Sequence, residues 1–112
     1  MIGKKPTISE STVQSQVKQY LELMGYKVYR VNNSGTWNES KHCYIFHGTA
    51  GVSDLIGFKA GHPALFVECK SPKGKPSPAQ VEFLGLVNAS DGAIGVCVDN
   101  LEALQKNISQ KR

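Results

Sequence analysis

The chain has 112 residues, of which 40% are hydrophobic and 20% are charged. This composition is typical of one globular domain and excludes a disordered chain. Thirteen basic and nine acidic residues give a net charge of +4, which suits a polyanionic partner but indicates nucleic-acid binding only weakly.

Targeting and redox signals point to the inside of a cell. No apolar run approaches the roughly 20 residues of a membrane span, and no apolar stretch follows the basic start, so we expect neither a secretion signal nor a membrane contact. Cys43, Cys69 and Cys97 are odd in number and widely spaced. That spacing favours reduced thiols in a cytoplasmic protein over a disulfide framework.

The first predicted element is a helix over residues 9–24. Capping-box patterns at Thr7 and at Ser11 leave its start open by one turn, and Gly25 suits its end. An alternating strand is then predicted over residues 26–31. The apolar stripe of the helix follows a period of 3.6 residues and consists of Val13, Val17, Leu21 and Met24.

Residues 32–52 are predicted to form a long irregular connection, in which "CYIF" at 43–46 could form a short strand. Connections of this length in a small domain are usually functional or mobile. Aromatic side chains such as Trp37 and Tyr44 could stack on bases, fill a dimer interface or pack as a satellite core. The sequence leaves these alternatives open.

Two apolar runs, "LIGF" at 55–58 and "ALFV" at 64–67, flank a turn and predict an antiparallel hairpin. With the turn centred on Gly61, Asp54 lies opposite Glu68, and opposed Cβ atoms are about 5 Å apart. Lys70 shares the face of Glu68 because strand side chains alternate with a period of two.

A basic, proline-rich loop follows the hairpin and leads into a helix with Ser77 as N-cap and Gly92 beyond its end. Residues 93–98 then predict a buried strand, and Asp99 is expected to cap a final short helix over 100–108. The predicted order is α-β-β-β-α-β-α, a mixed α/β sheet with helices on its faces.

The opposed carboxylates of Asp54 and Glu68 need compensation, because they repel each other and lose water beside a core. A divalent cation between them would provide it, and oxygen ligands suit Mg²⁺ or Mn²⁺. An ion pair with Lys70 would compensate in part. Alternatively, Asp54 caps a turn while Glu68 and Lys70 are solvated strand ends.

Two further polar residues have both a functional and a capping interpretation. Glu10 lies three residues before Val13, on the core side of the first helix, where it could supply a third metal ligand or cap the helix. Gln80 lies in the first turn of the later helix, where it could belong to the same site or form a capping box with Ser77.

Taken together, "SESTVQSQV", "GVSDL", "VECK" and "SPAQ", in this order between residues 10 and 98, resemble the PD-(D/E)XK nuclease superfamily and specifically its VRR-NUC family. The resemblance implies a restriction-endonuclease-like αβββαβ core, one nuclease domain over residues 1–112, and a Mg²⁺- or Mn²⁺-dependent phosphodiesterase without a nucleotide cofactor. Cys69 departs from the bulkier apolar residue that is frequent at its position, but it points to the opposite face.

The resemblance also implies residue roles. Lys70 would orient or activate the attacking water, and Gln80 would position Lys70, water or phosphate. The implied metal ligands are Asp54, Glu68, the backbone carbonyl of Cys69, and Glu10 either directly or through water. The residues expected to contact DNA are Gln14, Lys41, Lys70, Lys73 and Lys75.

The expected substrate is branched DNA, because stand-alone members of the family look like structure-selective nucleases. A four-way (Holliday) junction is the most attractive substrate, and its resolution needs two symmetric nicks and therefore a homodimer. A monomeric flap or single-strand nuclease is the enzymatic alternative. The other alternative is a non-catalytic DNA-binding module of the same fold.

Overall fold

The computed structural model describes residues 8–31, 35–46 and 48–110. Over these residues the chain forms three helices and six strands. Their bounds are α1 (Glu10–Leu23), β1 (Lys27–Arg30), β2 (Gly35–Asn38), β3 (Cys43–Phe46), β4 (Leu55–Phe58), β5 (Ala64–Cys69), α2 (Pro78–Ala89), β6 (Ala93–Val98) and α3 (Leu101–Gln110).

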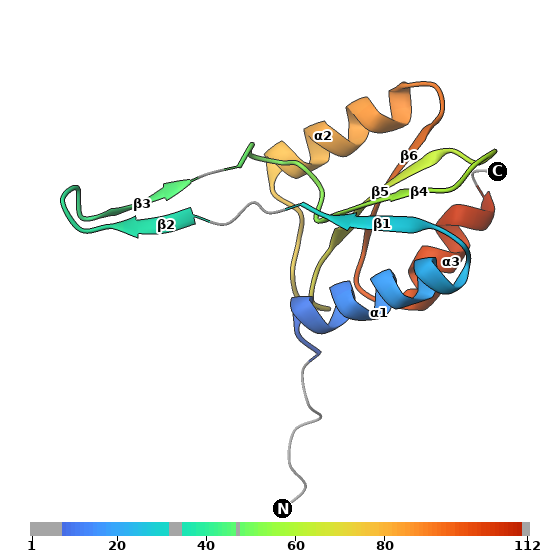
Figure 1. Cartoon of the computed structure of the whole chain (residues 1–112), viewed down its shortest axis with the longest axis horizontal. Coiled ribbons are helices and arrows are strands. Elements are labelled where there is room, and N and C mark those ends of the chain that lie inside the picture. The colour runs from blue at the N-terminus through green and yellow to red at the C-terminus, as the bar shows by residue number, and fades with distance from the viewer. Residues whose placement is uncertain (1–7, 32–34, 47, 111–112) are drawn as a thin grey trace, which may run out of the picture.

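Four strands form the main sheet in the order β1-β4-β5-β6. The β1–β4 and β4–β5 pairs are antiparallel, whereas β5 and β6 run parallel because α2 provides the crossover between them. Helices α1 and α3 lie on one face of this sheet and α2 lies on the other (Figure 1). The predicted mixed sheet with helices on both faces is therefore confirmed.

The core lies between the sheet and the α1/α3 layer. Val13, Val17 and Leu21 of the predicted stripe are fully buried there. Met24 is an exception, because α1 ends at Leu23 and Met24 is its half-exposed C-cap. The main sheet residues of this core are Val28, Leu55, Leu65, Val67, Cys69, Ile94, Val96 and Val98.

Helix α2 is fastened to the opposite face by a polar and an aromatic contact. The side-chain amide of Asn88 donates to the carbonyl of Gly95 and accepts from its N–H, at 2.8 and 2.9 Å. Phe83 meets Phe66 edge to face, with ring centroids 5.9 Å apart. These contacts fix α2 over β5 and β6.

The start of α1 differs from both capping patterns in the sequence. Ser9 is the N-cap, and its hydroxyl accepts a hydrogen bond from the N–H of Thr12 at 3.2 Å. The pattern at Ser11 is wrong because the helix already begins at Glu10, and Thr7 lies outside the described residues. Ser9 prevails because a serine hydroxyl caps a helix without needing an acidic partner.

The start of α3 also differs from the prediction by one residue. Asn100, rather than Asp99, caps the helix, because its side-chain oxygen accepts from the N–H of Ala103 at 2.8 Å. Asp99 instead accepts a hydrogen bond from the Asn100 side chain. Asparagine and aspartate are about equally good N-caps, so composition alone does not decide between neighbours.

The connection predicted as irregular contains a hairpin, in which β2 and β3 pair antiparallel with Trp37 opposite Tyr44. The "CYIF" strand is confirmed. We call residues 35–46 the arm, because they project from the sheet and no other described helix or strand packs against them (Figure 1). A satellite core is therefore the wrong interpretation for Trp37 and Tyr44, which are both exposed.

No helix within residues 8–31, 35–46 and 48–110 is both long and apolar enough to cross a membrane. All three cysteines are free thiols. Cys43 is exposed on the arm, Cys69 is buried in the core, and Cys97 is half-buried on β6.

Candidate metal centre

The β4–β5 hairpin brings two acids to one place. Its register has Leu55 opposite Val67 and Ile56 opposite Phe66, as predicted. Extended by one residue, the same register places Asp54 opposite Glu68. One carboxylate oxygen from each of Asp54, Glu68 and Glu10 lies within 4.8 Å of the other two, so the three predicted acids converge. We call this group of three acids the metal centre, because it is the candidate site for a cation.

Glu10 reaches the metal centre from the first turn of α1. The helix buries Val13 one turn later, and this orients the Glu10 side toward the sheet. Its carboxylate remains 47% exposed and lies 3.6 Å from Nζ of Lys70. Glu10 is therefore the solvent-facing member of the three acids.

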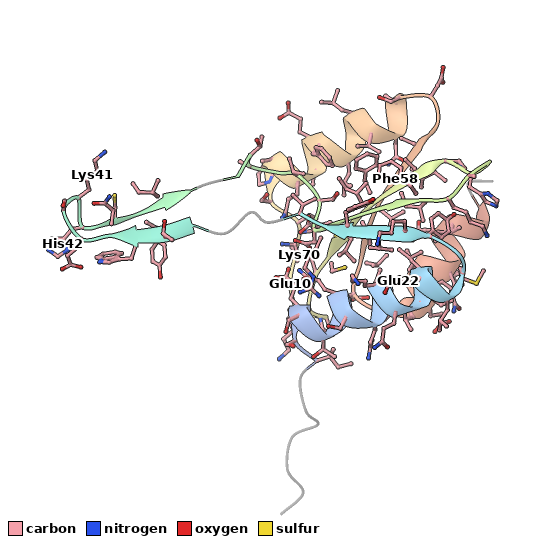
Figure 2. All side chains as sticks on the ribbon, in the orientation of Figure 1. Glu10, Glu22, Lys41, His42, Phe58 and Lys70 are labelled. Carbon is pink, nitrogen blue, oxygen red and sulfur yellow. The ribbon has the colours of Figure 1, made fainter. Side chains whose placement is uncertain are left out.

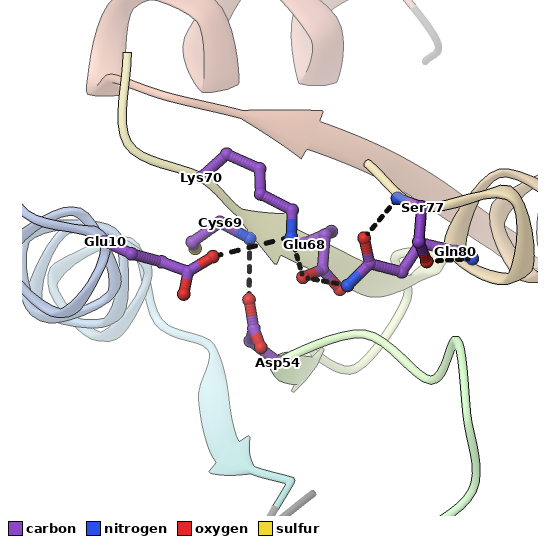
Figure 3. Close-up of polar contacts among 7 residues, drawn as sticks. All are labelled: Glu10, Asp54, Glu68, Cys69, Lys70, Ser77 and Gln80. Carbon is purple, nitrogen blue, oxygen red and sulfur yellow. Dashed lines mark hydrogen bonds and ion pairs between the residues drawn. The ribbon is translucent and has the colours of Figure 1, made fainter. Parts of the chain in front are cut away.

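Glu68 is the buried member, with an exposed fraction of 1%. Its Oε1 accepts a hydrogen bond from Nε2 of Gln80 at 2.9 Å and lies 3.8 Å from Nζ of Lys70 (Figure 3). Its Oε2 is buried and has no hydrogen-bond partner among the described residues. A buried carboxylate oxygen without a donor is costly, and either protonation of Glu68 or a bound cation would relieve this cost.

Burial raises the pKa of Glu68 to about 8, because removal from water disfavours the charged form. Asp54 adds to the rise, since its carboxylate can accept a hydrogen bond only from protonated Glu68 and repels the ionised form. Lys70 acts in the opposite direction and Glu10 adds a smaller increase. Without a further cation, the metal centre favours a protonated Glu68.

Asp54 is held by the strand that carries Glu68. Its Oδ2 accepts a hydrogen bond from the N–H of Cys69 at 2.9 Å. The N–H of Lys70 bonds to Val98 on β6. In a trans peptide the N–H and C=O point in opposite directions, so the carbonyl of Cys69 is directed away from β6, toward the Asp54 side. The Cys69 side chain points into the core, as predicted.

Lys70 provides the positive charge of the metal centre. Its ammonium lies between the carboxylates of Glu10 and Glu68, and its side chain is only 19% exposed (Figure 3). The alternative in which Glu68 and Lys70 are solvated strand ends is therefore wrong.

Gln80 both forms the capping box and contacts the metal centre, so the two predicted interpretations hold together. Its side-chain oxygen accepts from the N–H of Ser77 at 2.8 Å while the Ser77 hydroxyl accepts from the N–H of Gln80, which completes a capping box. The remaining amide N–H₂ donates to Glu68. The start of α2 thus fixes the orientation of the Gln80 amide and, through it, the Glu68 carboxylate.

Gly51, in the "GVSD" stretch, permits α2 to approach the metal centre. Its φ is +89°, and a Cβ built there would lie 2.4 Å from the carbonyl oxygen of Ala79. Only glycine tolerates both the left-handed conformation and this approach. The first turn of α2, which carries Gln80, therefore packs directly on the backbone before Asp54.

The remaining predicted DNA-contacting residues are spread over the surface. Lys73 and Lys75 are exposed on the loop after β5, next to the metal centre in sequence, and Gln14 is half-buried one turn after Glu10. Lys41 lies at the tip of the arm, away from Lys70 and Glu10 (Figure 2). The structure therefore brings Lys41 to a separate region of the molecule.

Two residues near the metal centre were missed by the sequence analysis. Ser53 is fully buried, and its hydroxyl donates to the carbonyl of Leu55, which stiffens the backbone around Asp54. Cys97 lies beside Glu68 in the β5–β6 register, and burial raises the pKa of its thiol. Cys97 could have been found by pairing its predicted strand, residues 93–98, in parallel with the strand that contains "VECK".

The donor set fits a hard divalent cation. Two oxygens bound to one Mg²⁺ are at most about 4.2 Å apart, since each lies about 2.1 Å from the ion. The three carboxylate oxygens lie within 4.8 Å of one another, so small side-chain movements would suffice. Oxygen donors alone are the preference of Mg²⁺ and Mn²⁺, and Oε2 of Glu68 would gain a partner.

The chain matches no protein-family model and no curated protein. Its function therefore has to be inferred from the geometry of the metal centre and from the motifs that build it.

Proposed function

We propose that this protein is a Mg²⁺- or Mn²⁺-dependent DNA endonuclease of the PD-(D/E)XK type, similar to the VRR-NUC family. The observation that carries the proposal is the convergence of Glu10, Asp54 and Glu68 beside the ammonium of Lys70. Carboxylates together with a fixed ammonium are what phosphodiester hydrolysis requires, because a nucleophile must be generated and negative charge must be neutralised.

Asp54 and Glu68 would hold the ion, with the Cys69 carbonyl as a further ligand and Glu10 on the solvent side. When bound, such an ion lowers the pKa of a coordinated water and polarises a phosphate oxygen. Glu68 is buried, so it would hold an ion where little water enters, and this would strengthen the electrostatic effects.

Lys70 acts on the water and the phosphate. Its Nζ is within 3.8 Å of carboxylate oxygens of both Glu10 and Glu68, so it can reach a water or phosphate oxygen held at the same acids. A compact ammonium there orients the attacking water and offsets the charge that develops on phosphorus-bound oxygens.

Gln80 is a positioning residue, because it contacts Glu68 rather than Lys70. Its amide keeps Oε1 of Glu68 in place and leaves Oε2 for the ion. A fixed carboxylate rotamer matters since catalytic groups must be held within about 0.5 Å of their productive geometry.

The helix and strand order of the main domain supports the restriction-endonuclease-like part of the proposal. Without the arm, the order is αβββαβ followed by α3, which is the order that the sequence resemblance implies. Lys73 and Lys75 extend the positive charge of Lys70 along one exposed loop, and such contacts to phosphates make DNA binding salt-dependent.

We further propose that the substrate is branched DNA, with a four-way junction favoured, and that the enzyme acts as a homodimer. Two symmetric nicks require two metal centres related by a two-fold axis, and a chain with one centre obtains them by pairing. This part rests on the family resemblance rather than on any junction-specific residue.

The test is cleavage of labelled four-way junction, flap, single-stranded and duplex DNA with Mg²⁺, Mn²⁺ or EDTA, together with the mass in solution. Metal-dependent paired nicks in the junction by a dimer would support the whole proposal. Cleavage of flaps or single strands by a monomer would mean that the protein is a flap or single-strand nuclease rather than a junction resolvase. Junction binding without cleavage in any metal would make the protein a non-catalytic binding module.

A further inference from the structure

The arm lacks the support that a two-stranded hairpin normally needs. Two paired strands alone are marginally stable in water and usually gain stability by packing on a further strand or helix. No described helix or strand packs on β2 or β3, and Figure 2 shows the arm projecting away from the domain. Its exposed side chains are thus available to a partner.

One face of the arm carries an aromatic cluster. Trp37 and Tyr44 are directly opposed in the β2–β3 register and therefore project to the same side. Their rings meet edge to face at 5.6 Å, and His42 meets Trp37 at 5.9 Å. Trp37 is 50% exposed and Tyr44 is 72% exposed, so both rings can be reached by a partner.

The tip of the arm carries one cation, Lys41. Lys41 and His42 lie at its tip (Figure 2). Glu39 keeps its negative charge, and its Oε2 accepts a hydrogen bond from Nε1 of Trp37 at 2.7 Å. This bond fixes the orientation of the indole, which remains half exposed.

The root of the arm is joined to the metal centre. Val31, which follows β1, donates its N–H to the carbonyl of Asp54 at 2.8 Å. The chain thus leaves the sheet beside a metal-centre residue, forms the arm, and returns to the same residue. A nucleic-acid strand that leaves the metal centre on this side of the domain would extend toward the arm.

We propose that the arm is a stacking platform for unpaired bases next to the bond that is cut. The inference rests on the proposed nuclease function and adds a source of structure selectivity, since branched DNA exposes unpaired bases and a continuous duplex does not. Aromatic rings combined with a cation are the usual means of binding single strands without reading sequence.

A second copy of the chain fits the arm less well. Stable protein interfaces bury about 800 Å² on each partner, and the aromatic pair alone offers about 300–500 Å², so a dimer contact would have to bury further surface beyond this pair. The core of a protein interface is also depleted in charged residues, and Lys41 and Glu39 border this cluster.

Trp37 is the single tryptophan of the chain, so its emission reports directly on the arm. In EDTA, which stops cleavage, we expect an oligothymidylate of about 20 nucleotides to quench Trp37 and a blunt duplex of equal length to leave it nearly unchanged. Quenching of the same size by the duplex, or none by the single strand from a protein that cuts DNA, would overturn the proposal.

Variants test the same platform by affinity. Trp37→Ala and Tyr44→Ala should each weaken binding of oligothymidylate by about tenfold, while Trp37→Phe and Tyr44→Phe retain most of it. Tyr29→Ala is the matched control, because Tyr29 is an equally exposed aromatic residue on β1, outside the arm. An equal loss in all three alanine variants would contradict the proposal.

Three outcomes separate this inference from its rivals. An emission shift that depends on protein concentration without DNA would show that the arm binds a second copy, and it would overturn the stacking role. Absence of cleavage on every substrate and metal would remove the nuclease function itself. Normal cleavage with unchanged Trp37 emission on binding would remove only the role of the arm.

Discussion

The arm leaves the domain next to the metal centre, but the two regions obtain their geometry in different ways. Asp54 and Glu68 are placed by a hairpin whose inner residues are buried, and Glu68 itself is 1% exposed. Trp37 and Tyr44 are held only by pairing between two exposed strands. Changes at the metal centre should therefore affect fold and chemistry together, whereas changes on the arm should leave the domain intact.

The largest effect is expected from the acids of the metal centre. Asp54→Asn and Glu68→Gln should each lower the rate of DNA cleavage on the order of 10³-fold, because an ion-binding charge is lost. DNA binding should be retained or improved, since repulsion of phosphate is reduced. Cleavage of a labelled junction and its binding in EDTA measure the two effects.

Glu22→Gln is the matched control, because Glu22 is an exposed acid on α1 that pairs with Lys18. It should cut at the wild-type rate. Wild-type cleavage by either metal-centre variant would mean that the residues have been assigned wrongly.

A somewhat smaller loss is expected from Lys70→Ala. Removal of the ammonium should slow turnover by about 10²–10³-fold but leave Mn²⁺ binding, because the three carboxylates remain. Titration with Mn²⁺ followed by calorimetry separates binding from turnover. Lys106→Ala, at an exposed position of α3, is the control for loss of one positive charge.

The buried Glu68 also couples the metal centre to stability. Because its folded-state pKa of about 8 lies above the ordinary 4.5, folding favours the protonated form, and the metal-free protein should lose stability as the pH rises from about 4.5 to about 8. Each unit of raised pKa corresponds to about 1.4 kcal/mol. Urea unfolding in EDTA across this range measures the loss.

Glu68→Gln should remove this pH dependence, since glutamine does not titrate. Saturating Mg²⁺ should reduce it in the wild-type protein, because a bound cation favours the ionised carboxylate. A wild-type slope equal to that of Glu68→Gln in EDTA would contradict the account of the buried acid.

The metal centre could be predicted because several local signals agree. The apolar pattern of "LIGF" and "ALFV" determines the register, since a shift by one residue would turn every buried side chain to the other face. Asp54 and Glu68 then follow by counting along the strands. The sequence also predicted the capping box at Ser77 and Gln80. The hydrogen bond from Gln80 to Glu68 was not predictable, because it depends on how α2 packs.

The arm could be predicted only in part, for a physical reason. Apart from Gly35 and Trp37, residues 35–42 are polar, and no other described helix or strand packs on this hairpin, so they leave no hydrophobic periodicity to detect. Only "CYIF" indicated a strand. The caps at Ser9 and Asn100 were missed because neighbouring residues have nearly equal capping ability.

Gly51 tests how tightly the metal centre depends on backbone packing. Gly51→Ala should lower the free energy of unfolding by about 2–4 kcal/mol, through overpacking against Ala79 and left-handed strain. Gly61→Ala has a similar φ of +79° but no atom within 4 Å, so it should cost only about 1–2 kcal/mol. Equal urea midpoints for the two variants would show that the close approach to α2 is unimportant.

The smallest effect on stability is expected on the arm. Tyr44→Ala should change the free energy of unfolding by no more than about 0.5 kcal/mol, because exposed substitutions that touch no core element rarely cost more. Leu65→Ala, in the buried hairpin strand, should cost about 2–5 kcal/mol. Urea unfolding followed by far-ultraviolet circular dichroism compares them. A loss for Tyr44→Ala close to that of Leu65→Ala would mean that the arm is part of the cooperative fold, and its large aromatic side chains would then need no ligand to explain them.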